Sequence, residues 1–207
     1  NINEYRKSLD YDIDGAVIKL DQLDLRETVG STAKTPKWAF AYKFPAEQKE
    51  TLLKDITIQV GRTGVLTPAA ELEPVFIAGS KVTRATLHNL ELIREKDIRI
   101  GDTVLIQKAG DIIPEVIRPV IEKRTGNEKI FDMPENCPVC NSKVVKPEGM
   151  VAHFCTNNEC SARSERKLIH FASRDAMNIE GLGPAIIKTF LQNGLINDIT
   201  DIYDLFE

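Results

Sequence analysis

The sequence lacks the features that mark several large classes of protein. Its 207 residues hold no apolar run close to the roughly 20 residues that a bilayer-crossing helix needs, and no secretory signal peptide is visible. There is no surplus of basic charge, because 27 lysines and arginines face 31 aspartates and glutamates, for a formal net charge of −4. These absences predict a protein outside the membrane, and they argue against nucleic-acid binding by bulk charge alone.

Cysteine is also scarce, but its four copies are concentrated in two close pairs. Cys137 and Cys140 form the first pair, and Cys155 and Cys160 the second. Such pairs supply the four soft ligands that a tetrahedral zinc ion binds at about 2.3 Å, which predicts a structural site in which His153 is not needed. The alternatives are two disulfides, which the absent secretory signal disfavours, four unrelated buried thiols, or a redox CxxC, which leaves the second pair without a role.

The first 45 residues carry strand patterns that cannot bury a core by themselves. We expect a helix end within 1–10, strands at 16–20 and 38–44, and a polar loop between the strands. Alternation puts the aromatic residues of the second strand on one face and small residues around Lys43 on the other, as suits a cleft. Two strands and a helix end are too few for independent stability. This segment is therefore predicted to be the remainder of a larger domain.

Residues 46–125 predict a small β-barrel. Glycine turns separate expected strands near 51–60, 65–77, 81–86, 103–108 and 112–123, with a helix near 89–96. Five strands with a helix after the third match the order of an OB-fold, which commonly binds oligonucleotides or oligosaccharides. A different five-stranded barrel is the alternative. Basic and acidic residues balance here, so nucleic-acid contacts would depend on individual side chains such as Arg62, Arg84 and Lys108, each of which could otherwise be a solvated surface charge.

The segment after the cysteines predicts two helices joined by a tight turn. Helical spacing over 161–174 places three apolar side chains inward (Leu168, Phe171, Ala172) and four basic ones toward solvent or phosphate (Arg163, Arg166, Lys167, Arg174). The turn contains Gly181 and Gly183, and Pro184 opens a helix that stops at Gly194. Free backbone amides at that helix N-terminus can hold a phosphate. A plain interhelical turn is the alternative.

These motifs together resemble those of the bacterial NAD-dependent DNA ligases over essentially the whole chain. Residues 14–19 (DGAVIK) and 38–45 (WAFAYKFP) resemble the fourth and fifth nucleotidyltransferase motifs. Three OB-domain signatures are matched, at 60–64 (VGRTG), 84–89 (RATLHN) and 108–114 (KAGDIIP). The four cysteines match the family's zinc finger, and the Gly181–Gly183 turn matches its first helix-hairpin-helix repeat.

The resemblance implies a multidomain chain that is mainly β and then α. Its parts would be a remnant of a nucleotidyltransferase (adenylation) α+β domain over 1–45, an OB-fold β-barrel domain over 46–125, a small four-cysteine zinc finger over 126–162, and the start of a helix-hairpin-helix domain over 163–207. Linkers near 45–50 and 124–132 would leave the angles between these parts open.

The implied function is sealing nicks in duplex DNA. A lysine attacks NAD to form lysyl-AMP, the AMP passes to the 5′-phosphate of the nick, and the 3′-hydroxyl displaces it, with Mg²⁺ assisting. The resemblance assigns nucleotide contacts to Asp14, Lys19 and Lys43, zinc binding to the four cysteines, and DNA contacts to a larger set (Arg62, Thr63, Arg84, Lys108, Gly181, Gly183). It also implies a monomer in the bacterial cytoplasm, associated with the nucleoid.

One departure from the family pattern decides what this chain can do. The family's nucleophilic lysine lies in a KxDG motif, which the sequence does not contain; residues 19–22 (KLDQ) lack the glycine. The nucleophile is expected upstream of Asn1, so no catalytic residue is assigned here and the chain is not expected to adenylate itself. A non-enzymatic OB and zinc-ribbon module that docks on nucleic acid or protein is the alternative function.

Overall fold

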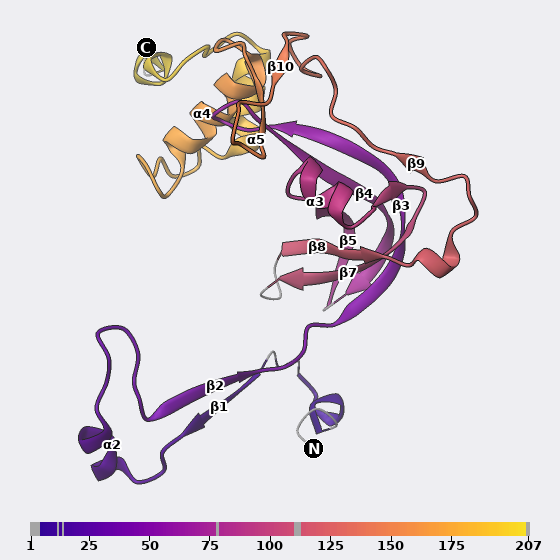
Figure 1. Ribbon diagram of the computed structural model, residues 1–207. Coiled ribbons are helices and arrows are strands. Elements are labelled where there is room, and N and C mark those ends of the chain that lie inside the picture. Colours follow the sequence, from indigo (N-terminus) through magenta and orange to yellow (C-terminus); the bar gives the residue numbers. More distant parts are fainter. Residues whose placement is uncertain (1–4, 12, 14, 78, 110–112, 206–207) are drawn as a thin grey trace.

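The computed structural model describes residues 5–11, 13, 15–77, 79–109 and 113–205 (Figure 1). The chain first forms a hairpin of two antiparallel strands, β1 (Gly15–Lys19) and β2 (Ala39–Lys43), which projects away from the rest of the molecule. Val17, Ile18 and Phe40 are 61%, 61% and 67% exposed, so the pair buries no core within the described residues. The prediction that this segment lacks a core of its own is confirmed.

One local expectation for this segment was wrong: helix α2 (Leu23–Val29) occupies the connection that was expected to be a polar loop. The helix end expected within 1–10 agrees with the described residues, in which Tyr5 is helical and the 3-10 turn η1 (Arg6–Ser8) follows it. No residue of α2 is buried, and its apolar residues Leu23, Leu25 and Val29 are exposed. Arg26 fastens it instead: its Nε donates to Leu20 O at 2.7 Å, and its guanidinium lies 4.6 Å from the centre of the Trp38 ring.

The next part is a closed five-stranded barrel with the topology of an OB-fold. The barrel strands are β3 (Gln48–Val60), β4 (Val65–Ile77), β5 (Ser80–Thr86), β7 (Thr103–Ala109) and β8 (Ile113–Pro119). They pair in the cyclic order β3-β4-β5-β8-β7-β3, and the parallel contact of Thr86 with Glu115 closes the ring. Helix α3 (Leu90–Glu95) follows the third strand, capped by the Asn89 side chain on Leu92 N at 2.8 Å. The OB-fold prediction is confirmed.

Alternation along these strands builds the barrel core. Along β4, Leu66, Pro68, Ala70 and Leu72 are buried while the residues between them are half-buried. The largest core cluster joins all five strands with α3. The last strand is shorter than the expected 112–123: β8 ends at Pro119, which cannot donate to the ladder, and the chain continues as the 3-10 turn η2 (Ile121–Lys123).

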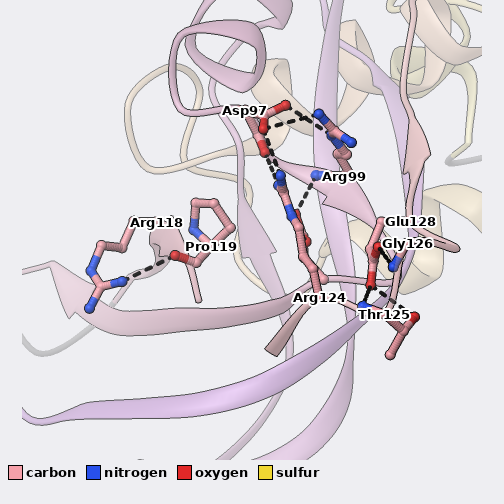
Figure 2. A network of polar contacts seen from close by, with 9 residues as sticks. Asp97, Arg99, Arg118, Pro119, Arg124, Thr125, Gly126 and Glu128 are labelled. Carbon is pink, nitrogen blue, oxygen red and sulfur yellow. Dashed lines mark hydrogen bonds and ion pairs between the residues drawn. The ribbon is translucent and has the colours of Figure 1, made fainter. Parts of the chain in front are cut away.

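A buried ion pair between Asp102 and Arg124 attaches the start of the linker to the barrel. The Asp102 carboxylate is fully buried and accepts from Arg124 Nε at 2.7 Å, Arg124 Nη2 at 2.9 Å and Arg99 N at 2.7 Å. Arg124 Nη1 also donates to Asp97 Oδ2 at 2.6 Å (Figure 2). Glu128 then accepts from nearby backbone amides, which lowers its pKa to about 2. Arg124 is therefore bonded to the barrel through several contacts, and the turn after it is closed by Glu128.

Beyond the linker, the cysteine segment extends the barrel sheet. Strands β6 (Arg99–Ile100) and β9 (Lys129–Ile130) pair, and then β10 (Val144–Val145) pairs with β11 (His153–Cys155). β11 pairs in turn with β4, with Phe154 opposite Val65, giving a seven-stranded sheet. The expected strands did not include β6, β9, β10 and β11.

Two helices and a short turn end the described chain. They are α4 (Ser161–Ala172), α5 (Pro184–Gln192) and η3 (Thr200–Asp204), and they share a separate small core (Leu168, Ala172, Ile187, Ile196, Ile202). Both helices lie close to their expected positions. No helix in the described ranges combines the length and apolar character needed to cross a membrane.

Candidate metal centre and nucleic-acid interface

The four cysteines converge on one point. Their Sγ atoms all lie within 4.8 Å of one another, and Cys140 Sγ is 3.4 Å from Cys155 Sγ. A tetrahedron of bonds of about 2.3 Å separates its sulfurs by about 3.8 Å, so this donor set fits a zinc ion. None of the four forms a disulfide. His153 is not part of the cluster.

Local turns hold the cysteines in place. In the first pair, Asn141 N donates to Cys137 O at 2.9 Å and Cys137 N donates to Ser142 O at 2.8 Å, with Asn141 at φ 58°. In the second pair, Cys160 O accepts from Arg163 N at 2.8 Å, so α4 starts directly at the last cysteine. The turns therefore form at the asparagines that the sequence places within each cysteine pair, such as Asn141 and Asn157.

Burial sets the protonation of the thiols. Desolvation raises the pKa of Cys155 to about 12 and raises that of Cys160 as well, whereas hydrogen bonds from Ser142 lower the pKa of Cys140 to about 6. Zinc ligates the thiolate, so metal binding at neutral pH must release protons from the buried pair. The centre is therefore a site where metal binding and folding are coupled.

The centre rests on the turn between β3 and β4. Cys155 N donates to Gly64 O at 2.9 Å, and Val60 and Leu66, on either side of the turn, belong to the same buried cluster as three of the cysteines. Gly64 has φ 88°, and a Cβ on it would lie 3.1 Å from Cys155 O. Glycine is therefore required by both the turn and the approach of the cysteine segment.

Arg62 and Thr63 lie at the tip of this turn and are exposed. Neither side chain has a hydrogen-bond or ion-pair partner within the described ranges. Both residues were expected to contact DNA. The structure leaves both side chains accessible to a ligand, next to the metal centre.

The other two barrel cations expected to contact DNA have protein partners. Arg84 Nε lies 2.7 Å from Glu71 Oε1, and this pairing lowers the pKa of Glu71, although the Arg84 side chain is 63% exposed. Lys108 is only 7% exposed, and its Nζ donates to Ser80 Oγ at 2.6 Å. Lys108 is therefore neither a solvated surface charge nor an open contact; its bond joins the β7–β8 and β4–β5 strand pairs.

The glycine turn before α5 is open. Gly181 has φ 83°, Gly183 N donates to Gly181 O at 3.0 Å, and a Cβ on either glycine would meet nothing within 4 Å. Gly183 is the N-cap, Pro184 is the first helical residue, and Ala185 and Ile186 in the first turn are exposed. Their amides have no partner within the helix by geometry.

The two lysines expected to contact the nucleotide share one face of the N-terminal hairpin. Lys19 pairs with Ala39 and Lys43 with Gly15, so the lysines lie at opposite ends of the ladder and point to the same side. Gly15 is required there, since a Cβ would lie 2.6 Å from Tyr42 O. Asp14, the third residue of this set, lies outside the described residues.

Arg163 is the residue whose place the sequence did not reveal. It was expected to face solvent or phosphate with the other basic residues of α4, but it is half-buried, and its Nη1 donates to Asn157 O and Asn158 Oδ1, each at 3.0 Å. Helical periodicity cannot show this, because the contacted segments lie outside the helix.

Comparison with known proteins identifies the parts of this arrangement. Residues 1–47 match the model of the NAD-dependent DNA ligase adenylation domain, 50–128 that of the NAD-dependent DNA ligase OB-fold domain, and 136–162 that of the NAD-dependent DNA ligase C4 zinc finger domain. These matches favour a ligase over a separate docking module, because a docking module does not explain an adenylation segment.

Curated relatives agree over nearly the whole chain. A DNA ligase of Acetivibrio thermocellus is 63% identical over 204 residues, which cover 99% of this chain and 31% of that protein. DNA ligases of Caldicellulosiruptor saccharolyticus (60% over 204 residues; 99% of this chain, 30% of the relative) and Desulfitobacterium hafniense (61% over 202; 98% and 31%) are similar. The chain thus spans about a third of the length of these relatives, and it belongs to the family of NAD-dependent DNA ligases.

Proposed function

We propose that this chain is the part of a nick-sealing enzyme that grips the DNA and contributes phosphate contacts to the nucleotide site. The observation that carries the proposal is the turn at 61–64, where Arg62 and Thr63 are exposed beside the metal centre and have no partner among the residues that the structure describes. An exposed guanidinium without an internal partner can donate to a phosphate at little desolvation cost. Contacts of this kind position a protein on duplex DNA without reading its sequence.

The hairpin supports the nucleotide part of the proposal. Lys19 and Lys43 lie four residue pairs apart on one face, about 13 Å at roughly 3.3 Å per residue, with the Val17 and Ala41 pair between them. Two flexible cations over an open surface suit the phosphates of NAD and of an adenylate intermediate. Asp14 would complete this pocket. Mg²⁺, when bound, would stabilise charge on the transferred phosphoryl group.

The glycine turn and the cysteines complete the proposed assignments. Gly181 and Gly183 leave the amides of the first turn of α5 open to a backbone phosphate, as the first hairpin of a helix-hairpin-helix domain would. The four cysteines would hold a structural zinc with no open coordination position. We further propose a monomer working on nicked duplex DNA in the bacterial cytoplasm, divided into domains at 45, 125 and 162.

The chain by itself is not expected to form the lysyl-AMP intermediate. Because its sequence has no KxDG motif, the nucleophilic lysine lies outside these 207 residues, and the chain should not label itself. Incubation with NAD carrying a labelled adenylate tests this point. Covalent AMP on the purified chain would show that another lysine can act as the nucleophile.

Fluorescence anisotropy tests the DNA grip directly. The chain with zinc is titrated onto nicked and intact duplexes of equal length over a salt series, together with Arg62→Ala and the matched control Lys54→Ala, an exposed lysine paired with Glu73. We expect preference for the nick, affinity that falls with salt, and a salt slope reduced by about one for Arg62→Ala only. Binding without preference would place nick sensing elsewhere, and no binding would favour protein docking.

A further inference from the structure

Arg163 lies where the barrel, the metal centre and α4 meet. Its guanidinium donates to Asn157 O and Asn158 Oδ1, in the loop between the last two cysteines, at 3.0 Å each. The same group packs on the turn at 61–64, since a Cβ placed on Gly64 would lie 3.3 Å from Arg163 Cζ and Nε. One side chain therefore contacts the metal-binding loop and the turn that carries Arg62 and Thr63.

This environment differs from that of a surface cation. Arg163 Nε is buried and has no hydrogen-bond partner in the described part of the chain, an arrangement that costs free energy. Arg166, three residues further along α4, is exposed in the ordinary way. Both bonds to the cysteine loop come from Arg163 Nη1, while Cζ and Nε of the same planar group lie against Gly64.

The turn itself depends on how Gly64 is held. Gly64 N donates to Gly61 O at 2.9 Å, Gly61 N donates to Val65 O at 2.8 Å, and Gly64 O accepts from Cys155 N at 2.9 Å. The Arg163 guanidinium occupies the space into which a side chain on the same glycine would project. A displacement of Gly64 would shift the two residues at the tip, because only three peptide bonds separate Gly61 from Gly64.

We propose that Arg163 is a positioning residue for the DNA contact of Arg62 and Thr63. The cysteine loop fixes the guanidinium, the guanidinium supports Gly64, and Gly64 sets the tip of the turn. The metal centre thus acts on DNA binding through the barrel turn. This inference rests on the proposed role of Arg62 in DNA binding.

A double-mutant cycle between Arg163→Gln and Arg62→Ala tests it, with nicked-duplex affinity measured by anisotropy and bound zinc measured for every variant. We expect each single change to weaken binding by about tenfold or more, as for loss of one charge-assisted hydrogen bond, and the double change to weaken it no further. Arg163→Lys should behave like Arg163→Gln, because it keeps the charge but loses the planar group that lies against Gly64. Arg166→Gln is the matched control, and its effect should add to that of Arg62→Ala.

Each outcome separates the inference from the proposal beneath it. If Arg62→Ala binds as the parent does, the proposed role of the turn is wrong and the inference falls with it. Three results would show that only the positioning role is wrong. In the first, Arg62→Ala weakens DNA binding but Arg163→Gln does not. In the other two, Arg163→Lys binds DNA as the parent does, or the losses of Arg62→Ala and Arg163→Gln add in the double variant. If Arg163→Gln loses its zinc, Asn158→Ala takes its place in the cycle, because it removes only one acceptor of the Arg163 guanidinium. Additive losses of affinity for Asn158→Ala and Arg62→Ala would then overturn the inference.

Discussion

The barrel and the N-terminal hairpin are both built mainly from antiparallel strand pairs rich in apolar residues, yet only the barrel buries these residues. Val104 and Ile106 in β7 are fully buried, whereas Val17 and Ile18 in β1 are 61% exposed. Closure of the sheet accounts for the difference: a ring of five strands has an inside, and a pair of strands does not. A strand pattern therefore predicts the strand but leaves the burial of its apolar face undetermined.

The two regions also differ in how they are attached. The barrel is joined to the cysteine segment by strand pairing with β11, by the buried Asp102–Arg124 pair and by a contact of Arg94 with Asp132. The hairpin continues into β3 through the short connection 44–47, in which Phe44 is buried and the Arg6 guanidinium lies 5.2 Å from the centre of its ring. We therefore expect the barrel and metal centre to respond to perturbation together, and the hairpin to respond separately.

Zinc removal should have the largest effect. Cys160→Ser, or a chelator, takes away an interaction worth on the order of 10 kcal/mol in small zinc-binding units, while the buried thiols regain protons. We expect amides of 136–162 to lose protection from hydrogen exchange and bound zinc to fall to zero, with β7 still protected. Ser142→Ala, which removes a hydrogen-bond partner of Cys140 but no ligand, should keep its zinc. Complete unfolding of the barrel on chelation would show that its core cannot stand alone.

The buried pair at the linker should come next. Asp102→Asn leaves Arg124 beside a neutral amide, and breaking a buried pair costs about 3 to 5 kcal/mol. Urea unfolding at constant m-value measures the loss. Arg94→Ala breaks the exposed pair with Asp132 and should cost under about 1 kcal/mol. Equal losses of unfolding free energy for the two variants would mean that the buried ion pair contributes no more to stability than the exposed one.

Sequence reasoning worked where a signal repeats along the chain or falls in one short motif. Alternation located the barrel strands, glycine turns separated them, and cysteine spacing brought the four thiols together. It missed the pairing of β11 with β4, since partners that are 89 residues apart, as Phe154 and Val65 are, leave no local pattern. It missed the burial of Lys108 and Arg163 for the same reason, because what covers each of them comes from a distant segment.

The smallest loss of stability is expected for Ile18→Ala, and its comparison with Ile106→Ala tests the contrast between barrel and hairpin most directly. Ile106→Ala removes a fully buried side chain from the barrel and should cost about 2 to 5 kcal/mol of unfolding free energy, through lost transfer energy and a cavity. Ile18→Ala makes the same chemical change on β1, where the side chain is 61% exposed, and should stay within about 0.5 kcal/mol. Urea unfolding of the two variants, followed by the same probe, compares them. A loss above 1 kcal/mol for Ile18→Ala would mean that the hairpin packs in solution against another surface, and the distinction would then be one of partner rather than of sheet closure.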